Sequence, residues 1–379
     1  MKILKNLLTD KLATPPTKHV PFLDLTREWA YFENDFLAAF KKFGRAGIYI
    51  LGSATATFEQ NFAAANGYKY GVAVSTGLAA LEVALLAHGL KPGDKVITVA
   101  NSAVATSLAI SNIGARPIFC DIKDNYLINE NKIEALITNK TRAILPVHLF
   151  GQIANLAEIN RLAARHQLIV IEDACQAHGA NFTGAGVINT KAFSFYPTKN
   201  LGALGEGGLI LTNDEKIRDF ATVYRNYGQQ GRYQHLIPGN NYRADALQCL
   251  FLNLKLAKLA DFIKTRQTIA QKYITELTNL KDLILPEFSS NHSYHLFVIR
   301  LQNEKRDALR TYLNSQGIET LIHYPTAIHR QACYAPQYPD LRLEKTDAFQ
   351  KEILSLPCYP FLKTTEQDYI IKKIKEFFS

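Results

Sequence analysis

The stretch Ala192-Phe-Ser-Phe-Tyr-Pro-Thr-Lys-Asn-Leu-Gly-Ala-Leu-Gly-Glu-Gly-Gly208 places one lysine, Lys199, between an aromatic and a glycine-rich segment. A lysine in such a turn is ordinarily solvated. Alternatively, apolar walls desolvate the amine, lower its pKa and make it nucleophilic enough to form a Schiff base. The aromatic residues before Lys199 favour the second interpretation, and the glycines after it allow the backbone to pass close to a ligand.

Around this stretch, short β-branched runs alternate with helical patterns from residue 70 onward. We expect strands near residues 71–74, 95–99, 116–122, 143–149, 168–171, 191–195 and 208–211, and helices near 77–89, 103–113 and 156–166. Such alternation is typical of an α/β fold with a mostly parallel central sheet and helices on both faces.

The remaining patterns suggest three parts: an N-terminal arm (1–30), a large α/β domain (31–245), and a long linking helix with a small C-terminal α+β domain (246–379). Residues 243–285 contain neither glycine nor proline, and their apolar residues recur at helical spacing, which predicts one long helix. Beyond it we expect strands at 293–301 and 318–322, and helices at 304–315 and 366–378.

The composition is that of a globular protein: 379 residues, of which 47% are hydrophobic and 20% charged. The sequence has no apolar run of 18 residues, so we expect no membrane segment. The apolar run at its start is too short for a signal peptide and has no small-residue cleavage site, so we expect no signal peptide there. Five scattered cysteines without C-x-x-C spacing argue against a disulfide framework and against a metal site, and favour the cytoplasm. The net charge of +9 lies in no dense basic run; it suits a small anionic substrate better than nucleic acid.

Ligands of open α/β sheets bind at the carboxyl ends of strands, and three such ends carry suitable groups. Ser75 and Thr76 begin a helix whose free N–H groups suit a phosphate, although a plain N-cap explains them equally well. Asp173 ends a very apolar strand, as acids commonly do. Lys199 follows Ser194 after another strand. An amine, a carboxylate and a phosphate cradle are what pyridoxal phosphate (PLP) needs.

With these residues in place, the chain from about Val20 onward resembles the DegT/StrS family of PLP-dependent nucleotide-sugar aminotransferases. The carrying motifs are Tyr49-Ile-Leu-Gly52, Phe58-Glu59, Glu172-Asp-Ala-Cys-Gln-Ala-His-Gly-Ala180, Ser194-Phe-Tyr-Pro-Thr-Lys-Asn-Leu-Gly-Ala203, Gly239-Asn-Asn-Tyr-Arg243 with Gln248, His323-Tyr-Pro325 and Leu354-Ser-Leu-Pro357. Each motif is modest alone, but their order and spacing are specific. The resemblance implies a fold-type-I PLP-dependent transferase that forms a homodimer with shared active sites.

The resemblance also implies roles by position. Lys199 matches the Schiff-base lysine, and Asp173 matches the partner of the cofactor's ring nitrogen. The other implied residues are Gln176 near the ring hydroxyl, Ser194 with the Thr76-Gly77-Leu78 amides around the phosphate, Asn241 reaching the phosphate of the neighbouring subunit, and His323, Tyr324 and His329 lining the sugar side.

Two positions depart from the family pattern. The usual aromatic residue that stacks on the PLP ring is replaced by Ala103, and Leu78 stands where threonine is frequent. Loss of the stack would remove about 0.5–1.5 kcal/mol of cofactor binding.

The function implied is transfer of an amino group, from glutamate, to a nucleotide-linked ketosugar for surface polysaccharide or glycoside biosynthesis. The stretch His323–Gln331 looks more like members that act on 3-keto-6-deoxyhexoses. Two alternatives stay open: a 4-ketosugar aminotransferase of the same family, and a PLP-binding regulatory or scaffold protein without turnover. A sugar 3-dehydratase is disfavoured because those members carry histidine in place of the lysine.

Overall fold

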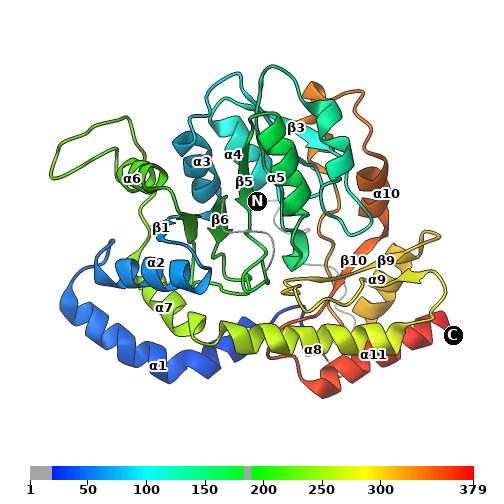
Figure 1. Cartoon of the computed structure of the whole chain (residues 1–379). Coiled ribbons are helices and arrows are strands. Elements are labelled where there is room, and N and C mark those ends of the chain that lie inside the picture. Colours follow the sequence, from blue (N-terminus) through cyan, green and yellow to red (C-terminus); the bar gives the residue numbers. More distant parts are fainter. Residues whose placement is uncertain (1–18, 183–188) are drawn as a thin grey trace, which may run out of the picture.

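The computed structural model describes residues 19–182 and 189–379 (Figure 1). Residues 1–18, most of the expected N-terminal arm, lie outside this part. Helix α1 begins at Leu25, so the end of the expected arm is helical. Within the described residues no helix is long and apolar enough to cross a membrane. The five cysteines are free thiols.

A seven-stranded sheet forms the centre of the larger body, in the order β1-β7-β6-β5-β4-β2-β3. The strands are β1 (Tyr70–Val74), β2 (Lys95–Val99), β3 (Arg116–Cys120), β4 (Thr141–Ile144), β5 (Ile169–Asp173), β6 (Thr190–Ser194) and β7 (Gly208–Thr212). Strand β7 pairs antiparallel with both of its neighbours, while the other pairs are parallel. The predicted mostly parallel sheet is therefore confirmed.

Helices cover both faces of this sheet. They are α2 (Ser53–Ala65), α3 (Gly77–Ala87), α4 (Ala105–Asn112), α5 (Leu156–Arg165), α6 (Glu215–Tyr224) and α7 (Ala246–Leu256). Helix α1 (Leu25–Ala46) packs on α7. In β7, Ile210 joins the apolar cluster with α3, α4 and α5, whereas its neighbours Leu209 and Leu211 join an aromatic cluster with α2 and α7. Alternate side chains of a strand point to opposite faces, so these two clusters lie on either side of the sheet.

The smaller body packs helices against a three-stranded antiparallel sheet in the order β10-β9-β8. Its elements are α8 (Leu259–Leu277), β8 (Leu283–Ile284), β9 (Phe297–Leu301), α9 (Lys305–Ser315), α10 (Glu344–Glu352), β10 (Ile353–Leu356) and α11 (Thr364–Phe378). Helices α8 and α11 run side by side below the sheet in Figure 1. A separate buried cluster that includes Tyr273, Phe297 and Ile370 holds this body together. The expected small α+β domain is therefore present.

The prediction of a single long helix over residues 243–285 is wrong. The chain forms two helices there, α7 and α8, with a turn at Ala257–Lys258. The ammonium group of Lys255 is buried and bonded to Glu28 and to the carbonyl oxygen of Gly202, which fixes α7 against the larger body. Tyr273 of α8 instead packs in the smaller body. Packing against two bodies bends the chain without glycine or proline.

Two expected strands also differ. Strand β9 begins at Phe297 rather than near residue 293. The interval 318–322 makes only isolated bridges, from Ile318 to Val20 and from Leu321 to Ser355, because its two ends pair with different segments. Helix α10 and strand β10 had not been expected.

Candidate active site

The ends of β1, β5 and β6 meet at one edge of the central sheet. Asp173 is the last residue of β5 and Ser194 the last of β6, and these neighbouring strands are parallel. Gly208 of β7 pairs with Ser194 on one side and with Val74 of β1 on the other. This register brings the turn after β1 beside Ser194.

Thr76, Gly77, Leu78 and Ser194 form a backbone-lined cradle. A Cβ atom on Gly77 would lie 2.5 Å from the Cβ atom of Ser194, so only glycine allows this approach. The hydroxyl of Thr76 accepts from the N–H of Ala79 and caps helix α3. Because the first N–H groups of a helix have no intrahelical acceptor, those of Gly77 and Leu78 can bind an anion at the positive end of α3.

Lys199 lies in a tight turn beyond Ser194, where its N–H donates to the carbonyl oxygen of Tyr196 (2.9 Å). Its side chain is half-buried. Burial lowers the pKa of the Lys199 amine, and the neighbouring Cys175 and Asp173 oppose that shift. Among the described residues, no carboxylate oxygen lies within 4 Å of its Nζ atom. The arrangement favours a free, reactive amine.

Asp173 is 4% exposed, and each of its carboxylate oxygens receives a hydrogen bond. The hydroxyl of Thr106 donates to Oδ2 (2.7 Å), and the N–H of Cys175 donates to Oδ1 (3.1 Å). Sequence reasoning missed Thr106. Only its position could have indicated a role, since it follows the carboxyl end of β2 on the same sheet edge.

Gln176 joins two other segments of the site. Its Oε1 atom accepts from the N–H of Phe150 (2.8 Å), and its Nε2 atom donates to the hydroxyl of Tyr324 (3.0 Å). Burial raises the pKa of Tyr324 to about 12. The Nδ1 atom of His323 lies 2.8 Å from the Ser355 hydroxyl, and burial lowers the pKa of His323 to about 4. Both side chains are therefore neutral at pH 7.

Two expected residues do not join this group. His329 is fully buried beside Phe119, with its Nε2 atom 3.2 Å from an oxygen of Asp347. Asn241 is exposed and forms an antiparallel bridge with Asn226 in the segment between α6 and α7. This segment projects from the body at the left of Figure 1.

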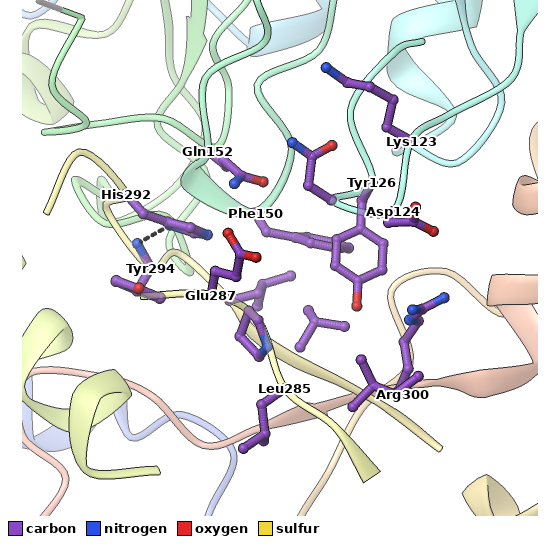
Figure 2. A pocket seen from close by; sticks show the side chains of 15 residues that line it. Lys123, Asp124, Tyr126, Phe150, Gln152, Leu285, Glu287, His292, Tyr294 and Arg300 are labelled. Atoms are coloured by element: carbon purple, nitrogen blue, oxygen red, sulfur yellow. Dashed lines mark hydrogen bonds between the residues drawn. The ribbon is translucent and has the colours of Figure 1, made fainter. Parts of the chain in front are cut away.

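A cavity of about 420 Å³ lies next to the site, between the larger and the smaller body. Figure 2 shows side chains from both bodies around it, including Tyr126, Phe150, Glu287 and Arg300. Among the described residues, none of those expected at the active site lines this cavity. Phe150 separates the cavity from the candidate active site, because its ring lines the cavity and its N–H donates to Gln176.

The grouped residues fit PLP. The cradle suits its phosphate, and the half-buried amine of Lys199 suits its aldehyde. The carboxylate of Asp173, which accepts two hydrogen bonds, suits its protonated ring nitrogen.

Comparison with known proteins agrees with this chemistry. The model of the DegT/DnrJ/EryC1/StrS aminotransferase family matches residues 31–375. The dTDP-3-amino-3,6-dideoxy-alpha-D-galactopyranose transaminase of Aneurinibacillus thermoaerophilus is 38% identical, over 94% of this chain and 99% of that protein. The 3-oxo-glucose-6-phosphate:glutamate aminotransferase of Bacillus subtilis is 34% identical, over 93% and 82%. A pleiotropic regulatory protein of Geobacillus stearothermophilus is 38% identical, over 95% and 99%.

A solved structure has the same fold. The crystal structure of NtdA from Bacillus subtilis with bound cofactor PMP superimposes with a TM-score of 0.92 at 31% identity, covering 99% of this chain and 91% of that one.

Proposed function

Because the chain belongs to the DegT/DnrJ/EryC1/StrS aminotransferase family and is a PLP-dependent sugar aminotransferase, we propose that it moves an amino group from glutamate to C3 of a nucleotide-linked 6-deoxyketohexose. One observation carries the proposal: Lys199, Asp173 and the Ser194 cradle meet at one sheet edge. We further propose a cytoplasmic enzyme that serves surface polysaccharide or glycoside biosynthesis.

The residues divide the chemistry between them. Bound PLP supplies an aldehyde that bonds to amines and a ring that accepts the electron pair left when a proton leaves the substrate carbon. The Nζ atom of Lys199 takes that proton and returns it during amino transfer. Asp173 would accept a hydrogen bond from the protonated ring nitrogen of bound PLP and keep that nitrogen protonated. The cradle at Gly77 and Ser194 fixes the cofactor so that Lys199 reaches the reacting carbon.

The choice of C3 and of glutamate draws on two kinds of support. One is the stretch His323–Gln331; the other is the names of two relatives, one a 3-amino sugar transaminase and one a 3-oxo sugar:glutamate aminotransferase. The test incubates the holoenzyme with glutamate and a panel of nucleotide-linked 3- and 4-ketosugars, and determines product mass and amine position. An amine at C4 would overturn the choice of position. Failure of glutamate to aminate the cofactor in a single turnover would favour a binding protein without turnover.

We also propose a homodimer with shared sites. Exposed apolar side chains follow α1 at Ile48, Tyr49 and Ile50, and the projecting segment carries Tyr233, which is 76% exposed. A dimer would cover these surfaces and bring Asn241 to the partner's cradle. Mixing inactive Lys199→Ala and Asn241→Ala proteins should then restore activity, because hybrid dimers contain one complete site. No recovery after confirmed subunit exchange would contradict sharing.

Ala103→Phe is expected to tighten PLP binding by up to about tenfold, because it restores an aromatic stack worth about 0.5–1.5 kcal/mol. Titration of the apoenzyme with PLP measures the change. Val104→Phe adds the same ring at the next, exposed position and should leave affinity unchanged. Equal or weaker binding by Ala103→Phe would show that Ala103 does not face the ring.

A further inference from the structure

We propose that Thr106 is a positioning residue of the transamination site: its hydroxyl, in contact with Ser102, holds the Asp173 carboxyl group in the orientation that suits the cofactor's ring nitrogen. The inference rests on the proposed role of Asp173. It adds to that role a residue of α4 that no motif of the sequence singled out.

Two hydrogen bonds to the buried Asp173 carboxyl group carry the argument. Thr106 Oγ1 donates to Asp173 Oδ2 (2.7 Å). It also lies 3.1 Å from Ser102 Oγ, whose one O–H is shared between Thr106 Oγ1 and the carbonyl oxygen of Ala103 (3.2 Å). The other oxygen, Oδ1, already accepts from the N–H of Cys175. Thr106 and Ser102 are 1% and 3% exposed, so water does not replace them easily.

With one donor on each oxygen, the carboxyl group of Asp173 is held as an acceptor. Rotation of the carboxyl group would break both of these bonds, so they hold it in one orientation. In that orientation it would accept from the protonated ring nitrogen of bound PLP. Buried hydrogen bonds to a charged group are among the stronger ones in proteins.

The position of Thr106 increases its importance in this chain. Its N–H donates to the carbonyl oxygen of Ala103 (3.2 Å), so it shares a turn with the position at which the family resemblance leads us to expect the missing aromatic ring. Without that stack, the link between Asp173 and the ring nitrogen contributes a larger share of the hold on the cofactor.

The test replaces Thr106 by valine, which keeps the shape and removes the hydroxyl. We expect PLP to leave the holoenzyme about 10- to 100-fold faster, and kcat to fall by a similar factor while the KM for the ketosugar stays unchanged. Thr106→Ser should restore both values. Ser107→Ala is the matched control: it removes a buried hydroxyl from the next residue of α4, and that hydroxyl has no partner among the described residues.

Three outcomes decide the question. Unchanged PLP release and kcat in folded Thr106→Val would overturn the inference. If Asp173→Asn also leaves both unchanged, the role of Asp173 itself fails and the proposed function with it. Should Thr106→Val not fold, Ser102→Ala replaces it: about threefold faster PLP release supports the inference, and an unchanged rate contradicts it.

Discussion

Replacing Lys199 by alanine is expected to lower transamination at least about 10³-fold while leaving the fold intact. Proton transfer by a positioned group contributes roughly 10²–10⁴-fold, and Lys199 also provides the amine that bonds to the cofactor. Its Nζ atom has no carboxylate within 4 Å in the described structure, so removing it breaks no ion pair. The free energy of unfolding of the apoenzyme should change little. Steady-state rates measure the loss of transamination, the cofactor's visible absorbance measures the loss of its bond to Lys199, and chemical denaturation measures the free energy of unfolding.

Alanine variants of two other lysines show whether the expected effects are specific to Lys199. Lys255 is buried against Glu28 and the carbonyl oxygen of Gly202, so Lys255→Ala should cost about 3–5 kcal/mol of stability. Exposed Lys216→Ala should change neither activity nor stability. Normal turnover by Lys199→Ala would remove this residue from the chemistry and with it the proposed mechanism.

The sheet and its site edge could be predicted because their signals are local. Apolar runs such as Ile169–Asp173 mark buried strands, and the alternation with helices makes the strands parallel. Parallel strands end at the same edge, so Asp173 and Ser194 had to be neighbours once their strands paired. Glycine at position 77 also carried a signal, since the close approach to Ser194 excludes a side chain.

What could not be predicted depends on packing between distant segments. The turn between α7 and α8 follows from the contacts of Lys255 with residues far away in sequence, and the local pattern is helical throughout. His329 was expected beside the sugar, but it is buried against Phe119 and Asp347. Thr106 stands 67 positions before Asp173, and nothing in its own neighbourhood announces the hydrogen bond between them.

Asp173→Asn is expected to reduce kcat by about three orders of magnitude. Two opposite charges about 4 Å apart attract by roughly 4 kcal/mol at an effective dielectric near 20, and a neutral amide gives up that attraction. The amide also fits its surroundings poorly. Thr106 and the N–H of Cys175 both donate to the carboxylate, so an amide can accept from one donor but must turn its NH₂ group toward the other.

The loss should appear in both catalysis and cofactor retention, because the same ion pair holds the ring and keeps it protonated. The KM for the ketosugar should change little, since Asp173 lies among strand ends and not beside His323. Asp124→Asn is the matched control: it removes an exposed carboxylate paired with Lys345 and should leave both properties unchanged. The contrary result is an Asp173→Asn variant that keeps its cofactor and loses less than about tenfold in kcat. An ion pair with Asp173 would then not be what keeps the ring nitrogen protonated, and another group at this sheet edge would have to do so.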